Sequence, residues 1–149
     1  MELIKNTLFA VMLAIALPAM SEDHTVEMLS SSNGQMMVFK PAVLKIQPGD
    51  TVTWKATNPG HNTASIDAMT ADNSLQWNGK INEELTITFT KEGVYGYKCT
   101  PHYILGMVGI IAVGDNLENL ANASEFAAAE EKKFATNKER FSSYINKLK

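Results

Sequence analysis

The sequence lacks a run of basic residues and carries little excess charge of either sign. Its 149 residues include 13 basic and 16 acidic side chains, which leaves a net charge of −3 at pH 7. Nucleic-acid binding normally requires a basic patch or stripe, so this balance argues against it. The sequence therefore indicates no nucleic-acid partner.

A long hydrophobic run is also missing. The apolar stretch 8–17 near the N-terminus is shorter than the roughly 20 residues that a membrane-spanning helix needs. Lys5 precedes it and Pro18–Ser21, with small residues, follows it, in the pattern of a secretory signal peptide. We expect residues 1–21 to be this signal, cleaved before Glu22. Residues 22–149 then form one exported domain with no membrane segment.

Cysteine is nearly absent, because Cys99 is the only one in the chain. A lone cysteine cannot form a disulfide within the chain, although export would normally favour disulfides. Its thiol needs protection in an oxidising compartment. Burial in the core is the ordinary way to provide it. Ligation of a metal ion is the alternative, and the neighbouring residues favour it.

Cys99 opens a nine-residue stretch, ending at Met107, that holds three potential metal ligands. His102 lies between them, so the order is C-x2-H-x4-M. Thiolate, imidazole and thioether together form a soft ligand set that suits copper, in particular a site of two histidines and one cysteine with a weak axial methionine. Zinc would accept two histidines and a cysteine, but the methionine argues against it.

This stretch supplies one histidine, so a second must come from elsewhere, and only His24 and His61 remain. His24 lies ahead of the first predicted strand, where a solvated histidine is the simpler interpretation. His61 follows a Pro-Gly turn at a strand edge, and ligands commonly gather on loops held by rigid strands. Taken alone, His61 is more often an ordinary loop residue. Its combination with the stretch that follows Cys99 favours it as a ligand.

The middle of the chain alternates short stretches of strand character with turns. Thr51–Lys55, for example, places Val52 and Trp54 on one face, as a half-buried strand does. Seven or eight such strands indicate a mainly β protein, an antiparallel β-sandwich. The most apolar strand, the last, is expected to lie centrally. The predicted strands are 25–29, 36–39, 43–46, 51–55, 85–90, 94–99 and 107–113.

The composition changes after Gly114. Residues 117–148 lack glycine and proline and are rich in helix-forming residues. Thr136–Glu139 has the form of a capping box, which predicts a break there and therefore two C-terminal α-helices. We expect this helical extension, from about residue 116, to pack on one face of the sandwich without a chemical role.

Several motifs together resemble the pseudoazurins, small periplasmic blue-copper proteins of the cupredoxin family. Plastocyanins share the spacing of the ligand stretch but end after the last strand, so the helical extension separates the two. The resemblance implies a cupredoxin-like Greek-key β-sandwich in the periplasm that binds one copper ion as Cu(II) or Cu(I). The motifs are Met37–Ala42, Gln47–Val52, Gly60–Asn62, Lys98–Tyr103, Gly106–Met107 and Ile111–Asp115.

The resemblance also implies residue roles. Asn62 would tie the segment of the second histidine to the cysteine loop and hydrogen-bond to the sulfur. Pro101 has no N–H to donate to that sulfur and would stiffen the turn. Met37 matches the position that packs near the exposed histidine ring. The copper ligands implied are His61, Cys99, His102 and Met107.

Partner docking is expected around His102, which would be the exit for the electron. The predicted apolar collar consists of Met37, Pro59, Pro101, Ile104 and Leu105, although Ile104 and Leu105 could equally be plain core. Pseudoazurins usually surround this patch with lysines. Lys98 and Lys80 remain here, but Ser31 and Pro59 stand where lysine is common in the family. Steering by charge should therefore be weaker.

The expected function is one-electron transfer by a monomer. By family analogy, the carrier would link a respiratory electron donor to a periplasmic reductase, such as the copper nitrite reductase of denitrification. A copper storage or delivery protein is the alternative, although a closed set of four protein ligands disfavours metal transfer. The same closed set leaves no position for a substrate. Since no Ser-His-Asp arrangement or carboxylate pair is visible either, an enzyme is not expected.

Overall fold

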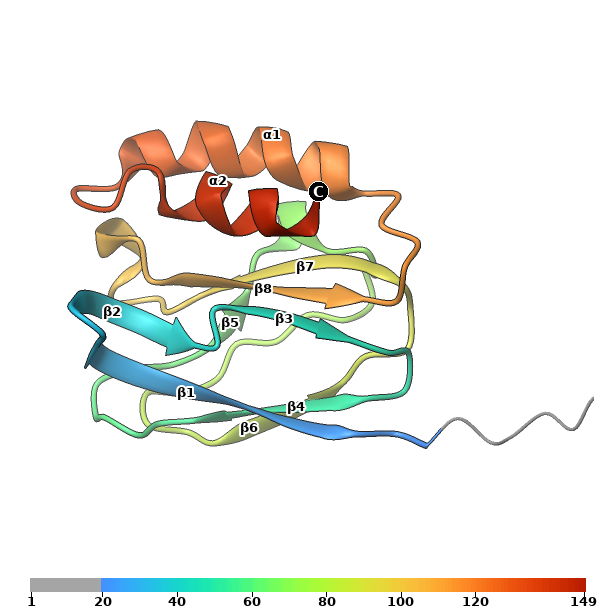
Figure 1. The fold of residues 1–149 in the computed structure, drawn as a ribbon. Helices are drawn as coiled ribbons and strands as arrows, with labels where there is room; N and C mark the ends of the chain where they lie inside the picture. Colours follow the sequence, from blue (N-terminus) through green and yellow to red (C-terminus); the bar gives the residue numbers. More distant parts are fainter. Residues whose placement is uncertain (1–19) are drawn as a thin grey trace, which may run out of the picture.

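A computed structural model describes residues 20–149 of the chain. The predicted signal peptide, 1–21, lies outside the described residues except for its last two positions. Among the described residues, no helix is both long and apolar enough to cross a membrane. The rest of the chain folds into two packed β-sheets with a helical layer on one side, as the sequence predicts (Figure 1).

Each sheet has four strands. The first has the order β2-β1-β4-β6 and the second the order β3-β8-β7-β5. The predicted antiparallel pairing is wrong for two pairs, because β1 is parallel to β4 and β3 is parallel to β8. The other pairs are antiparallel. The strands are β1 (Asp23–Ser32), β2 (Gln35–Lys40), β3 (Val43–Ile46), β4 (Thr51–Lys55), β5 (Ala64–Ser65), β6 (Leu85–Thr88), β7 (Gly93–Lys98) and β8 (Val108–Val113).

The hydrophobic pattern of each strand explains its place. Every residue of β8 is buried, and this strand lies between β3 and β7, centrally as predicted. In β4, Val52 and Trp54 are fully buried while Lys55 is exposed. The buried faces meet in an aromatic core between the sheets, where the ring centroids of Trp54 and Tyr97 lie 5.1 Å apart. Burial of these large side chains is the main stabilising contribution to the sandwich.

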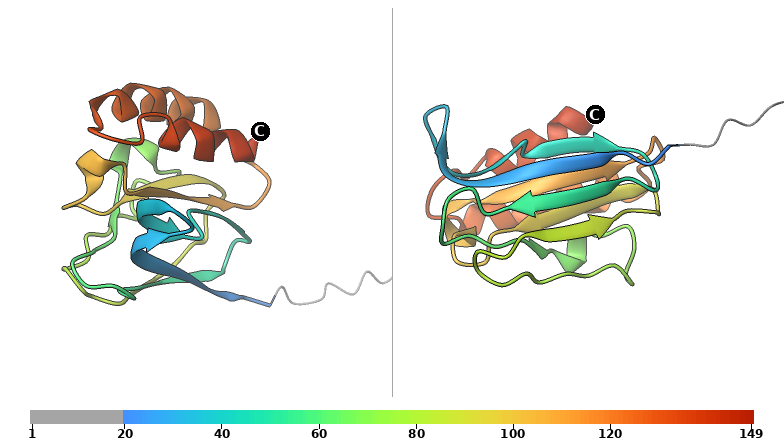
Figure 2. Two further views of the ribbon diagram at one scale, coloured as in Figure 1. Left: turned by 60° about the vertical axis from the view of Figure 1, so that its left-hand side comes forward. Right: turned by 90° about the horizontal axis from the view of Figure 1, so that it is seen from below.

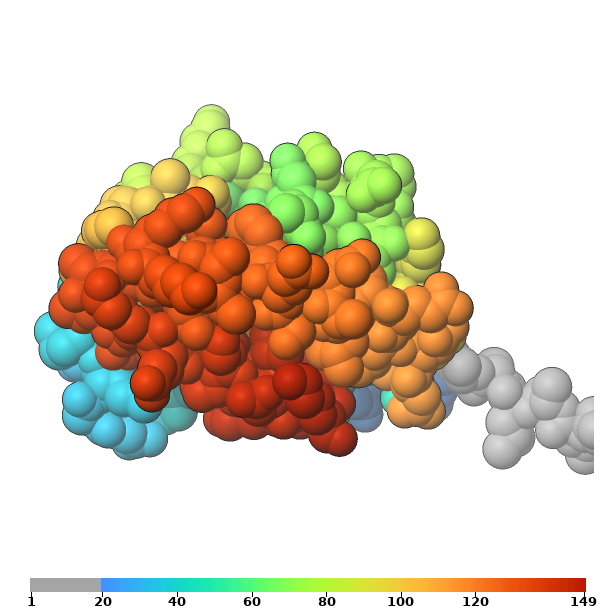
Figure 3. Space-filling view, turned by 90° about the horizontal axis from the view of Figure 1, so that it is seen from above, coloured from blue at the N-terminus to red at the C-terminus, as the bar shows by residue number. Residues whose placement is uncertain are grey.

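α1 and α2 cover the outer face of the second sheet and lie on one side of the sandwich (Figure 2). Seen from above, the C-terminal residues form a large part of this face of the molecule (Figure 3). A second core forms beneath the helices, in which Ala123, Phe141 and Ile145 cluster with outer side chains of β7 and β8. The predicted packing of the extension is therefore confirmed. The helical elements are η1 (Asp67–Met69), η2 (Tyr103–Leu105), α1 (Leu120–Glu130), η3 (Glu131–Lys133), α2 (Arg140–Ile145) and η4 (Asn146–Leu148).

The break between the two helices is where the sequence predicts it, but the capping box is wrong. α2 begins at Arg140 after the N-cap residue Glu139, and no side chain caps it. The reason is that Asn137 adopts a left-handed conformation with φ 57°, so the helix cannot start three residues earlier. The hydroxyl of Thr136 instead donates to the carbonyl of Leu105, at 3.2 Å.

One end of the sandwich gathers the segments that matter for the site. The connection after β4, the loop between β7 and β8, and the turn between β1 and β2 all lie there (Figure 1). β1 and β2 pair at Leu29–Val38 and at Ser31–Met36, but not between these two pairs. Met37, with φ 51°, interrupts the ladder at this point. The interruption lies opposite Ser30, a residue that contacts the candidate site.

Candidate metal centre

The ligand loop is the hairpin connection between β7 and β8. Because Lys98 pairs with Val108, Cys99 and Met107 face each other at the start and end of the loop. The Cys99 amide donates to the Met107 carbonyl at 3.0 Å, and the Met107 amide donates to the His102 carbonyl at 3.2 Å. The local backbone therefore closes into a tight turn that brings the main chains of all three predicted loop ligands together. Cys99 and Met107 are fully buried.

His61 is the second histidine of the site. Its segment is held from the other side by Asn82, which accepts a bond from the Gly60 amide at 2.7 Å and donates its own amide to the His61 carbonyl at 2.8 Å. His61 is fully buried beside Cys99. His61 is thus the candidate that the fold brings to the loop.

His24 lies elsewhere, and the expectation that it is solvated is wrong. Its Nε2 lies 3.0 Å from Oδ2 of the buried Asp50, and only 19% of its side chain is exposed. Asp50 also accepts a backbone amide bond from Glu22 at 2.8 Å. The buried carboxylate needs hydrogen-bond donors, and His24 supplies one of them. His24, Glu22 and Asp50 form a cluster separate from the three residues of the loop site.

Three donor atoms converge on one point. The Nδ1 atoms of His61 and His102 lie 3.1 Å apart, and the Cys99 sulfur lies 3.7 Å from the first and 3.4 Å from the second. A point equidistant from the three atoms is about 2.0 Å from each. For comparison, histidine nitrogen and cysteine sulfur bind zinc in proteins at about 2.0–2.3 Å. The two imidazoles and the thiolate would therefore be able to hold a metal ion between them.

Ser30 orients the first imidazole. Its hydroxyl lies 3.1 Å from His61 Nε2, on the opposite side of the ring from Nδ1. When Nε2 carries the ring proton and donates it to this oxygen, the lone pair of Nδ1 points at the centre, as a neutral ligand requires. Sequence reasoning missed Ser30, because a serine in a strand carries no signal of such a contact.

Burial changes the pKa of two of the candidate ligands, Cys99 and His61. It raises the pKa of the Cys99 thiol, an effect that bonds from the backbone amides of Asn62 and His102 partly oppose. Burial also lowers the pKa of His61, and the nearby His102 lowers it further. His61 is therefore neutral near pH 7. A bound metal ion would replace the thiol proton, since thiolate is the ligating form.

Asn62 connects the two halves of the site. Its Oδ1 accepts the Thr100 amide at 2.7 Å, and its Nδ2 donates to the Gly79 carbonyl at 2.9 Å and to the Thr100 hydroxyl at 3.2 Å. The side chain is buried. The segment of His61 and the loop of Cys99 are therefore fastened to each other directly beside the sulfur.

The loop also reaches the surface. His102 is partly exposed, and Ile104 beside it is 53% exposed, so the alternative that Ile104 is plain core is wrong. Met36, at 58%, is a further exposed apolar residue in the β1–β2 region. Of the other predicted collar residues, Pro59 and Pro101 are exposed, whereas Met37 and Leu105 are half-buried.

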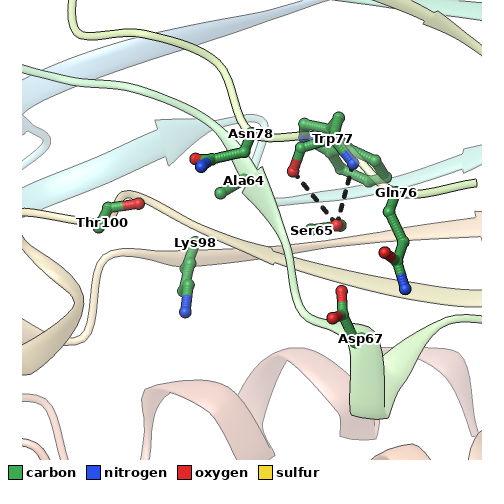
Figure 4. Close-up of a pocket in the computed structure, with 8 residues that line it drawn as sticks. All are labelled: Ala64, Ser65, Asp67, Gln76, Trp77, Asn78, Lys98 and Thr100. Carbon is green, nitrogen blue, oxygen red and sulfur yellow. Dashed lines mark hydrogen bonds between the residues drawn. The ribbon is translucent and has the colours of Figure 1, made fainter.

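A polar groove of about 420 Å³ lies on the flank of this loop (Figure 4). Lys98 and Thr100 line one side of it, and Asp67 and Gln76 lie across from them. Ser65 is bonded to the Trp77 backbone at its floor. The Lys98 ammonium also lies 4.9 Å from the centre of the Tyr103 ring. Lys98 therefore places a positive charge next to the ligand loop, as the sequence predicts.

The fold and the donor set are those of a small copper protein. The family model described as copper binding proteins, plastocyanin/azurin family, matches residues 26–114. Pseudoazurin of Methylorubrum extorquens is 41% identical over 121 residues, 81% of this chain and 82% of the relative. Pseudoazurin of Paracoccus pantotrophus is 41% identical over 111 residues, 74% of this chain and 77% of the relative.

Solved structures agree with these relatives. The crystal structure of pseudoazurin from Methylobacterium extorquens aligns with a TM-score of 0.74 at 35% identity, over 85% of this chain and 99% of that one. A pseudoazurin structure from Sinorhizobium meliloti aligns at 0.69 and 40% identity, over 83% and 98%. The chain belongs to the pseudoazurin family. It is therefore a one-copper electron-transfer protein that donates electrons to redox partners, and not an enzyme.

Proposed function

We propose that His61, Cys99, His102 and Met107 hold the copper ion and that the protein carries single electrons through the periplasm to a reductase. The observation that carries this proposal is the triangle of donor atoms, whose sides of 3.1, 3.4 and 3.7 Å match a metal ion in its centre. The acceptor that we propose is a copper nitrite reductase of denitrification, supplied from a respiratory electron donor.

The protein's contribution is to hold the ligands still. Copper supplies the one-electron change, and its two oxidation states prefer different geometries. His61, Cys99, His102 and Met107 would hold the ion with two imidazoles, a thiolate and a thioether, a donor set that suits both oxidation states. The hairpin and the bonds of Asn62 fix these residues, so the protein would rearrange little between the two states. Pro101 leaves the sulfur without a further amide bond, and Met37 packs at the edge of the site.

The surface around His102 is the proposed docking site. An exposed imidazole edge within apolar side chains suits a short-lived complex with a small interface. Lys98 and Lys80 supply positive charge, but Ser31 and Pro59 supply none. We therefore infer that association depends on apolar contact more than on charge. The rate of electron transfer to the purified nitrite reductase should change little with ionic strength, and a steep decrease with salt would contradict this.

The predicted signal peptide supports the proposed periplasmic location. A positively charged start, a short apolar stretch and small residues before Glu22 form the expected signal. Expression of the full chain in a bacterium should yield, in the periplasmic fraction, a monomer whose mass corresponds to residues 22–149. Recovery of the uncleaved chain from the cytoplasm would contradict the proposed location without affecting the copper site.

Colour tests the ligand set directly. The purified protein loaded with Cu(II) should absorb visible light intensely, because charge transfers from the thiolate to the metal. Cys99→Ser should abolish this band, whereas His24→Ala, which changes a histidine outside the site, should keep it. A colourless copper-loaded protein would refute the proposal. A storage or delivery role is disfavoured because Cys99, His61 and Met107 are fully buried and offer a partner no route for exchange.

A further inference from the structure

The connection between the two C-terminal helices is bonded to the ligand loop at three consecutive carbonyls. The Ala135 amide donates to the carbonyl of Ile104 at 2.7 Å. Asn137 Nδ2 donates to the carbonyl of Leu105 at 2.8 Å. Arg140 Nη1 donates to the carbonyl of Gly106 at 3.0 Å. The helical extension therefore does more than cover a sheet, because it contacts the last residues before Met107.

Arg140 extends the connection to a second loop. Its guanidinium also donates to the carbonyl of Met37 at 2.8 Å and to the carbonyl of Met36 at 3.1 Å. It is the only arginine of the chain. The planar fork of arginine can bond several fixed acceptors at once, which the ammonium of lysine cannot do in the same geometry. Only 8% of Arg140 is exposed, so its buried guanidinium depends on these carbonyls for its hydrogen bonds.

The contact is close enough to need glycine at position 106. Gly106 has φ 76°, and a Cβ there would lie 3.1 Å from the Asn137 side chain and 3.2 Å from the Phe134 ring. Its carbonyl belongs to the same peptide group as the Met107 amide, which donates to His102. Fixing the Gly106 carbonyl therefore fixes the plane of the peptide that carries the axial methionine.

We propose that residues 134–140 form a clasp that positions the ligand loop, with Arg140 as a positioning residue for Met107. The inference rests on the proposed role of Met107 as the axial ligand. A thioether binds copper weakly, so its place is set by the protein rather than by the bond itself. The clasp joins the loop of Met107 to the segment of Met37. Figure 1 shows the β7–β8 loop, the β1–β2 turn and the α1–α2 connection at the same end of the molecule.

The first test uses the copper-free protein, so it does not depend on metal binding. Hydrogen exchange of individual amides is measured by NMR for the wild type and for Arg140→Lys, which keeps the charge and loses the fork. The Met107 amide should exchange about tenfold faster in this variant, because local opening of the loop becomes easier. The control Glu131→Gln weakens a different buried contact of the extension, the bonds from Ser142 to the Glu131 carboxylate. It should leave Met107 exchange unchanged.

A gentler variant covers the case in which Arg140→Lys does not fold. Asn137→Gly removes the bond to Leu105 and keeps the left-handed backbone, which glycine adopts readily. Asn33→Gly is its matched control, since Asn33 has φ 50° in the turn between β1 and β2. Asn137→Gly should speed Met107 exchange at least threefold, and Asn33→Gly should not.

The visible spectrum of the copper-loaded forms is the second readout. The relative intensities of the charge-transfer bands report the axial interaction and should change with Arg140→Lys but not with Glu131→Gln. Wild-type exchange at Met107 in Arg140→Lys and Asn137→Gly, or an equal increase in the controls, would overturn the clasp. A colourless wild type would instead refute the proposed function, and the exchange measurements would still decide the clasp.

Discussion

The bonds of the Asn62 side chain link the two halves of the site, the segment of His61 and the loop of Cys99. Asn62→Ala removes an acceptor from the Thr100 amide and two donor contacts, one to the Gly79 carbonyl and one to the Thr100 hydroxyl. Since the side chain is buried, water cannot easily replace these partners. The substitution should therefore lower both the stability of the fold and the rigidity of the site.

The expected loss of unfolding free energy follows from the backbone groups that lose their hydrogen-bond partner. A buried amide or carbonyl without a partner costs about 1–3 kcal/mol. The Thr100 hydroxyl lies at an exposed residue and can bond to water, so it adds little. With the Thr100 amide and the Gly79 carbonyl both affected, and some relaxation around the new cavity, we expect the free energy of unfolding to fall by about 2–4 kcal/mol.

Chemical denaturation of the copper-free protein measures this loss. The matched control is Thr63→Val, which removes the neighbouring buried bond from Trp77 Nε1 to the Thr63 hydroxyl, at 3.0 Å, without touching the ligand loop. Both variants should be destabilised, but only Asn62→Ala should also bind copper more weakly and show a shifted charge-transfer band. A loss of stability below about 1 kcal/mol in Asn62→Ala would refute the reasoning, because leaving even one buried group without its hydrogen bond should cost at least that much.

Three further predictions concern other parts of the molecule. Burial alone would raise the pKa of Asp50, but bonds from the backbone amides of Glu22 and Gln47 and from His24 lower it overall. Its carboxylate therefore stabilises the fold at neutral pH, and this stabilisation is lost as pH falls below about 4. In denaturation series, Asp50→Asn should have a smaller free energy of unfolding than the wild type at pH 7. That free energy should also decrease less between pH 5 and pH 2 in the variant than in the wild type. Gly109→Ala should lower the unfolding temperature markedly, because its Cβ would overlap the Tyr97 ring. Wild-type stability of this variant would contradict the placement of that ring. Met107→Gln should retain copper and lower the reduction potential in voltammetry, and an unchanged potential would mean that Met107 is not the axial ligand.

The sandwich could be predicted because the order of apolar and polar residues in its strands indicates which side chains are buried. Alternation in β4 and the wholly apolar β8 indicate which faces are buried. β5 was not predicted, because Ala64–Ser65 is too short to show a period and is held by pairing with β7. The break before Arg140 was found for the wrong reason, since the capping-box letters cannot reveal that Asn137 turns left-handed.

Most of the loop site was also predictable, because three donor types within nine residues are a dense local signal. The choice of His61 over His24 needed the position of a turn relative to a strand, the ligand stretch that follows Cys99, and the resemblance to the pseudoazurins. Its geometry confirms that Nδ1 of His61 meets the loop. The contact of Ser30 with the far side of the ring could not be predicted, because it depends on β1 passing beside the turn after β4.

The clasp was missed for a more general physical reason. Its acceptors are the backbone carbonyls of Ile104, Leu105 and Gly106, and every residue has a carbonyl, so no letter of the sequence marks them. The donors are equally ordinary, apart from one feature. The chain has twelve lysines but a single arginine, and this arginine lies where one side chain donates to several backbone carbonyls at once. The proposed clasp would give the helical extension of this chain a physical use. Its bonds to the three carbonyls would restrain the ligand loop at the residues just before Met107.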